Sequence, residues 1–265
     1  MSLPPYQQRL CNDNPQNHSD LRAVVINTSL KRQAGKSHTK LLLDVAGQIM
    51  EKNSVSVSHI HMLDHQIAFG VQPDMTEHGW DRDDFPALWK VIDAADIVLI
   101  GTPIWLGEES SLCRLLIERL YGMSGLLNDK GQSIFYGKVG GAVITGNEDG
   151  IKHCAMTILY ALQHLGLTIP PQADCGWIGE AGPGPSYGDD AEGGPVGFDN
   201  EFTQRNATIM TWNLMHMARL LCRNDAQPSP RLYHAPDFRR GLPWQRDRGA
   251  RWPVFISDRF ISEAE

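Results

Sequence analysis

Hydrophobic and polar residues alternate in blocks along this chain, and the blocks predict an α/β protein. Short apolar runs that end abruptly in polar residues are typical of parallel strands buried on both faces. Such runs predict strands at 21–29, 54–63, 96–101 and 137–146, and a weaker one at 167–176. Between the strands, apolar residues recur at helical spacing, as in Leu41, Leu42 and Val45. These segments predict helices at 37–50, 85–95, 110–122, 151–166 and 201–223.

Strands that alternate with helices in this way favour a doubly wound fold. Right-handed crossovers would place the strands in a parallel sheet with helices on both faces. Five strands in one unit favour the order 2-1-3-4-5. We therefore predict an N-terminal arm at 1–20, an α/β domain at 21–224 and a C-terminal extension at 225–265.

The composition is that of an ordinary globular protein, with 42% hydrophobic and 21% charged residues among 265. No apolar run reaches the roughly 20 residues of a membrane helix, and the first residues lack the apolar core of a signal peptide. We therefore expect a cytoplasmic protein with no membrane partner. A net charge of −7 argues against nucleic acid as a partner. The five cysteines form no C-x-x-C pair, so free thiols are expected.

The segment Ser29–Thr39 nearly matches the phosphate loop of nucleoside-triphosphate enzymes, G-x-x-x-x-G-K-S/T. Gly35 and Lys36 fit this motif, but Leu30 replaces its first glycine, and no aspartate ends a strand where it could hold magnesium. The segment still brings hydroxyls, a lysine and a histidine to a helix start, namely Ser29, Lys31, Ser37, His38 and Thr39. This cluster favours an anion site at the helix N-terminus. The alternative is that Ser37 or Thr39 only caps the helix.

Two further loops should lie at the same edge of the sheet, because ligands of doubly wound folds bind where the strand order reverses. The loop after 96–101 offers apolar and aromatic surface through Thr102, Pro103, Ile104, Trp105, Leu106 and Gly107. The alternative for Trp105 is a place in the core. The loop after 137–146 offers polar groups for a ring edge through Thr145, Gly146, Asn147, Glu148 and Gly150. An anion site, an aromatic wall and a polar edge together predict FMN as the ligand.

These three loops, with Asp83 and Asp84 before the helix at 85–95, resemble the NADPH-dependent FMN reductase family of flavodoxin-like proteins over about residues 22–175. The resemblance implies a flavodoxin-like FMN-binding domain, with NADPH or NADH as transient reductant. It implies that the first loop binds the FMN phosphate through Ser29, Lys31, Ser37 and Thr39. It places Pro103, Ile104, Trp105 and Gly107 along the isoalloxazine, and Thr145, Gly146, Asn147 and Gly150 at its polar edge. The related iron–sulfur flavoproteins carry a cysteine motif that this chain lacks, so no cluster is expected.

We therefore expect an FMN-dependent oxidoreductase that passes electrons from NAD(P)H to a small-molecule acceptor such as a quinone or free flavin. No side chain is expected to act as an acid or a base, because the cofactor carries the chemistry. The alternatives are a flavodoxin-type electron carrier and a nucleotide-binding or regulatory protein without flavin.

Two other features remain at this stage. His59, His61 and His65 lie close together, so a metal site is conceivable, but polar contacts at a strand end are favoured and no metal is expected. The loop at 179–197 is too long for a simple connection, and the extension carries Trp244, Trp252 and Phe255. We expect a homodimer or homotetramer in which this loop and the extension help to enclose the site.

Overall fold

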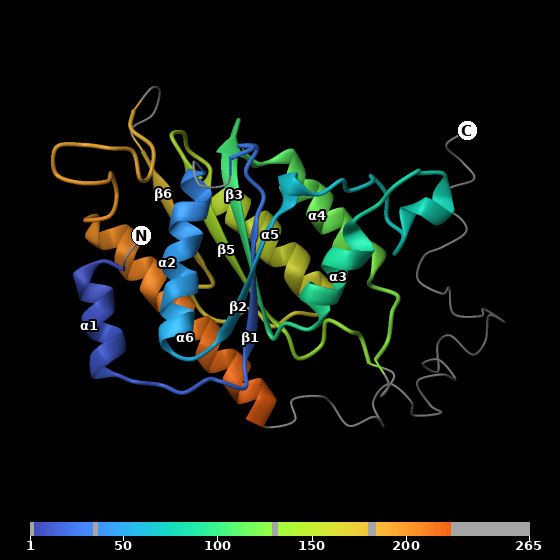
Figure 1. Cartoon of the computed structure of the whole chain (residues 1–265), viewed down its shortest axis with the longest axis horizontal. Helices are drawn as coiled ribbons and strands as arrows, with labels where there is room; N and C mark the ends of the chain where they lie inside the picture. Colours follow the sequence, from blue (N-terminus) through green and yellow to red (C-terminus); the bar gives the residue numbers. More distant parts are fainter. Residues whose placement is uncertain (1–2, 34–36, 129–131, 180–183, 224–265) are drawn as a thin grey trace, which may run out of the picture.

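The structure is a computed structural model that describes residues 3–33, 37–128, 132–179 and 184–223, with a parallel sheet at its centre (Figure 1). Five parallel strands lie in the order β2-β1-β3-β5-β6. They are β1 (Arg22–Asn27), β2 (Ser56–His61), β3 (Ile97–Trp105), β5 (Val139–Gly146) and β6 (Asp174–Ile178). The predicted order 2-1-3-4-5 is confirmed, because the remaining strand, β4, pairs only with β3.

Helices cover both faces of the sheet, as Figure 1 shows. One layer holds α1 (Pro5–Asp13), α2 (His38–Lys52) and α6 (Glu201–Arg223), and the other holds α3 (Phe85–Asp93), α4 (Ser111–Gly122) and α5 (Ile151–Leu165). Two short 3-10 helices, η2 (Met62–Asp64) and η3 (Met75–His78), lie between β2 and α3. Successive strand residues face opposite layers, so Val24 joins the core under α3, α4 and α5 while Val25 joins the core under α2 and α6.

The segment after residue 101, which we expected to be a loop, is part of a β-hairpin. β3 continues to Trp105 and pairs in antiparallel register with β4 (Glu108–Glu109). Leu106 and Gly107 connect the two strands with φ angles of 54° and 81°. Positive φ at both central residues is the requirement of the tight hairpin turn that matches the strand twist. The strand is therefore longer than its apolar run.

The last strand begins later than its apolar pattern indicates. The predicted strand at 167–176 contains Pro170 and Pro171, which have no N–H to donate to a neighbouring strand. Only an isolated bridge joins Thr168 to Val139, and regular pairing with β5 starts at Asp174.

Helix α1 lies within the predicted N-terminal arm and contacts α6. The amide nitrogen of the buried Gln7 lies 3.0 Å from Gln204 Oε1 and 3.1 Å from Thr208 Oγ1.

The domain boundaries and the homodimer or homotetramer stay predictions. The extension at 225–265, with Trp244, Trp252 and Phe255, lies outside the described residues.

A buried ion pair fixes the segment between β2 and α3. Arg119 of α4 donates to Asp83 at 2.6 Å, and both side chains are fully buried. Asp83 also accepts hydrogen bonds from the backbone nitrogens of Ala68, Met75 and Phe85. The pair therefore joins α4 to the middle of this segment and to the start of α3.

Replacing Arg119 by methionine should destabilise the protein by about 3–5 kcal/mol, because the substitution leaves the carboxylate of Asp83 buried without its cation. Urea unfolding measures this change. Arg82→Met is the matched control, because Arg82 pairs with Asp84 on the surface, where its side chain is 63% exposed. Equal effects of the two substitutions would contradict the prediction.

Candidate functional site

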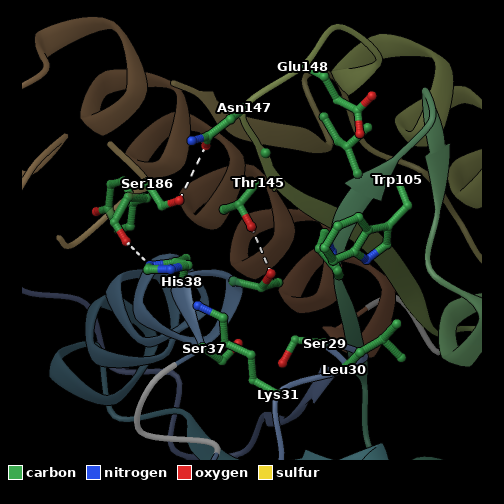
Figure 2. A pocket seen from close by; sticks show the side chains of 15 residues that line it. Ser29, Leu30, Lys31, Ser37, His38, Trp105, Thr145, Asn147, Glu148 and Ser186 are labelled. Carbon is green, nitrogen blue, oxygen red and sulfur yellow. Dashed lines mark hydrogen bonds between the residues drawn. The ribbon is translucent and has the colours of Figure 1, made fainter. Parts of the chain in front are cut away.

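A cavity of about 720 Å³ opens at the carboxyl ends of β1, β3 and β5, and Figure 2 shows its lining. All three predicted loops contribute to it. The predicted residues that line it are Ser29, Lys31, Ser37, His38, Thr39, Pro103, Ile104, Trp105, Thr145, Gly146, Asn147 and Glu148. Three further lining residues were not predicted, namely Leu30, Ser186 and Tyr187. Leu30 lies inside the first loop, between the predicted Ser29 and Lys31, and this position could have indicated that it lines the cavity.

The first loop brings hydroxyl groups to the N-terminus of α2. Ser37 caps this helix, since its Oγ accepts a hydrogen bond from Lys40 N at 3.1 Å. The capping alternative is therefore right for Ser37, but it does not account for Ser29. Ser29 is 4% exposed, and its Oγ has no hydrogen-bond partner within the described part of the chain. A buried hydroxyl without a partner is costly, so a ligand that accepts its hydrogen bond would be stabilised here.

Lys31 supplies positive charge to the same end of the cavity. Partial burial lowers the pKa of Lys31, and the carboxylate of Asp189 opposes this shift. Thr39 and Thr145 share a hydrogen bond of 2.7 Å between their hydroxyls, which links the first loop to the third. Gly35 and Lys36, which carry the phosphate-loop motif, lie outside the described residues.

The β3–β4 hairpin forms one wall of the cavity. Trp105 lies beside the cavity and is 55% exposed, so the alternative that it is a core residue is wrong (Figure 2). Leu30, which is 45% exposed, also lines the cavity and adds apolar surface to it. A half-exposed tryptophan in an apolar lining offers a surface suited to a planar ring.

Four predicted residues support this wall instead of lining the cavity. Leu106 N donates to Glu148 Oε1 at 2.9 Å, and Thr102 Oγ1 accepts from Ser110 N at 2.9 Å. A Cβ atom on Gly150 would come within 2.7 Å of the carbonyl oxygen of Gly107. Thr102, Leu106, Gly107 and Gly150 thus fix the hairpin against α4 and the third loop, and they are not among the residues that line the cavity. Their contact with the ligand stays a prediction.

The long loop after β6 closes another side of the cavity. Asn147 Nδ2 donates to the carbonyl oxygen of Gly184, and His38 Nδ1 donates to that of Tyr187 at 2.8 Å. The ring of Tyr187 is fully buried, and its hydroxyl accepts from Gln204 Nε2 at 2.9 Å. Burial raises the pKa of Tyr187, so its hydroxyl stays neutral. The described part of this loop therefore encloses the site within one chain, while residues 180–183 lie outside the description.

The cysteines nearest the hairpin are buried. Burial raises the pKa of Cys113 to about 12 and that of Cys154 to about 11. Neither thiol is therefore an activated nucleophile.

The described residues contain neither a cluster of metal-binding side chains nor a membrane-spanning helix. Within 3–33, 37–128, 132–179 and 184–223, no group of three His, Cys, Asp or Glu side chains could hold a metal ion. In the same ranges, no helix has the length and apolar character needed to cross a membrane.

Comparison with known proteins decides the family. The model of the NADPH-dependent FMN reductases matches residues 21–177. This chain belongs to that family. The match confirms the resemblance, and with it FMN as the cofactor; the family's name gives NADPH as the reductant of such proteins.

Two known proteins that are similar to this chain are described as having different functions. A Mycobacterium bovis protein described as a divalent metal cation transporter is 51% identical over 262 residues, which are 94% of this chain. The chain spans 37% of the length of that relative. An 8-demethyl-8-aminoriboflavin-5'-phosphate synthase from Streptomyces davaonensis is 35% identical over 208 residues, or 76% of this chain and 78% of that protein.

Solved structures agree with the fold. RosB with bound 8-demethyl-8-formylriboflavin-5'-phosphate has a TM-score of 0.73 and 31% identity, and the match covers 92% of this chain and 98% of RosB. An oxidoreductase from Corynebacterium diphtheriae has a TM-score of 0.50 at 14% identity, covering 76% of this chain and 97% of that one, which supports the fold alone.

The residues present fit FMN. The unpartnered hydroxyl of Ser29, the cation of Lys31 and the start of α2 suit a phosphate at one end of the cavity. Trp105 and Leu30 suit the planar ring system, and Asn147 offers polar atoms for its edge.

Replacing Trp105 by alanine should weaken FMN binding by about 1–3 kcal/mol, the range for an aromatic side chain that stacks on a planar base. The fold should hold, because the side chain is half exposed. Titration calorimetry and thermal unfolding measure the two quantities. Trp80→Ala is the control, since Trp80 is 42% exposed and does not line the cavity. If Trp105→Ala unfolds at a lower temperature than the wild type while its FMN affinity is unchanged, Trp105 has no role in binding the ligand.

Replacing Ser29 by alanine should weaken FMN binding by about 1.5–3 kcal/mol, the range for a hydrogen bond to a charged group. Stability should change little, because Ser29 Oγ makes no hydrogen bond within the described chain. Ser56→Ala, at an exposed serine that starts β2, is the control. Magnesium-dependent ATP binding, together with unchanged FMN affinity, would show that the loop serves a triphosphate instead.

Proposed function

We propose that this protein is an FMN-dependent oxidoreductase that passes electrons from NAD(P)H through bound FMN to a small-molecule acceptor such as a quinone or free flavin. One observation carries the proposal: a single cavity joins an anion-binding end to an aromatic wall that stays half exposed. An open aromatic wall leaves room for a second planar molecule beside the first. FMN supplies the hydride and electron chemistry when it is bound.

The chain's own residues bind and orient the ligand. Ser29, Lys31 and Thr39 would hold the phosphate with the backbone N–H groups at the start of α2, where the helix dipole favours negative charge. Asn147 is itself held by the carbonyl oxygen of Gly184, so its side chain is fixed before a ligand arrives. Such preorganisation lowers the entropy lost on binding.

No side chain is assigned as an acid, a base or a nucleophile. The raised pKa values of Tyr187 and Cys154 keep their protons in place at neutral pH. Electron transfer through a flavin does not require a protein group that titrates near neutrality. The expectation of no catalytic side chain stays part of the proposal.

A second candidate function is chemistry on the flavin ring itself. It is favoured by the similarity to the Streptomyces davaonensis synthase and to RosB, whose bound ligand is a modified riboflavin 5'-phosphate. In that case FMN would be the substrate, and the same phosphate-binding end would hold it. A flavodoxin-type carrier, without NAD(P)H oxidation, is the remaining alternative.

One assay separates these functions. The flavin-loaded protein is mixed with NADPH or NADH and with menadione or free FMN, while the nicotinamide absorbance and the mass of the flavin are followed. We expect nicotinamide oxidation that requires both bound FMN and an acceptor, with the flavin mass unchanged. Flavin-free protein is the control. A flavin of changed mass would support the synthase function, and a reducible flavin that never oxidises nicotinamide would support the carrier.

A further inference from the structure

His61, the last residue of β2, lies directly behind the first loop of the cavity. It is 9% exposed and does not line the cavity. Its Nδ1 lies 3.0 Å from Asn27 Nδ2, and its Nε2 lies 3.0 Å from the carbonyl oxygen of Lys31. The side chain therefore connects the end of β1 to the middle of the loop.

The chemistry of these partners fixes the state of the imidazole. The amide nitrogen of Asn27 can only donate, so Nδ1 must accept. The carbonyl oxygen of Lys31 can only accept, so Nε2 must carry the proton. The orientation of the Asn27 amide is fixed in turn, because its Oδ1 accepts from Ser29 N at 3.1 Å. Both ring nitrogens of His61 are thus engaged, and neither is left to bind the metal ion that the three nearby histidines made conceivable.

Asn27 holds the two ends of the first loop. It is 4% exposed and is the last residue of β1. Its Oδ1 receives the backbone N–H of Ser29, where the loop begins, and its Nδ2 lies 3.3 Å from Ser37 Oγ, where α2 begins. One amide therefore sets the separation of the two serines.

We propose that His61 is a positioning residue for the phosphate-binding end of the cavity and makes the site selective for a phosphorylated flavin over riboflavin. It orients the Asn27 amide, which holds Ser29 and Ser37, and it fixes the backbone of Lys31. His61 itself touches no ligand. This inference rests on the proposed FMN site.

The physical basis is the direction of the hydrogen bonds. A phosphate is bound tightly only when its donors point at it before binding, because reorienting them costs free energy. In metal sites, removing an outer residue that orients the metal ligands lowers affinity roughly 10- to 100-fold, and we take the same range as the expectation here. An effect that acts through the first loop should be confined to the phosphate. Riboflavin has the same ring system without the phosphate, so the ratio of the two affinities isolates the effect.

The test is His61→Phe, which keeps a ring of similar shape and removes both nitrogens. Dissociation constants for FMN and riboflavin are measured at one pH by quenching of flavin fluorescence. We expect FMN binding to weaken roughly 10- to 100-fold and riboflavin binding to change little, so that the selectivity for FMN falls. His61→Gln, whose amide can replace one of the two hydrogen bonds, should recover part of the selectivity. His59→Phe is the matched control, because His59 is an exposed residue of the same strand. The ratio of FMN to riboflavin affinity of this variant should equal that of the wild type.

A purely structural role for His61 predicts a different result. If FMN and riboflavin weaken together, or if the selectivity is unchanged, the proposal is overturned. Should His61→Phe fail to fold, the selectivity of His61→Gln decides, and a value equal to that of the wild type overturns the proposal. Failure of the FMN site itself is distinguishable, because Ser29→Ala would then also leave FMN affinity unchanged.

Discussion

Strand β3 is the constraint on which the rest of the site depends. It is paired with β1 on one side and with β5 on the other, with Asn27 opposite Gly101 and Thr145 opposite Pro103. A Cβ atom on Gly101 would lie 2.4 Å from the side chain of Leu43, so the lack of one lets α2 pack closely on the sheet. The start of α2, the end of β5 and the tip of β3 are thereby brought to one edge.

The two ends of the cavity are held in place by different forces. At the phosphate-binding end, hydrogen bonds to buried side chains fix the backbone of the loop, as where Asn27 Oδ1 accepts from Ser29 N. At the hairpin, close glycine contacts fix the shape. A Cβ atom on Gly146 would lie 2.9 Å from that of Ile104, and one on Gly150 would collide with Gly107. Directional bonds suit recognition of an anion, whereas close packing suits a rigid wall for a planar ring.

The strand order and the three loops could be predicted because they follow from local patterns. Each parallel strand is an apolar run, and a doubly wound order puts the ends of three particular strands together. The hairpin could not be predicted, because β4 consists of Glu108 and Glu109, whose pairing depends on β3 and not on their own propensity.

The missed lining residues have a related cause. Ser186 and Tyr187 lie in a segment with no helical or strand periodicity, and they reach the cavity through long-range contacts with Asn147, His38 and Gln204. Sequence reasoning could place that loop at the correct edge of the sheet but could not select its residues. The support given by His61 was hidden for the same reason, since its partners lie about thirty residues away along the chain.

The phosphate-binding end does not distinguish an oxidoreductase from an enzyme that modifies flavin, because both must hold the same phosphate. The distinction must therefore arise beside the ring system. There the lining includes Trp105, Leu30 and Glu148, and Glu148 Oε1 accepts a hydrogen bond from the hairpin backbone. Half-exposed apolar surface favours the entry of a second planar molecule, whereas covalent change of the ring would require a reacting group held against it. Because the nearby thiol of Cys154 has a raised pKa and lies under the hairpin against the carbonyl oxygen of Gly107, it is not such a group. The half-exposed apolar lining beside the ring system is therefore the observation on which our proposal of electron transfer rests.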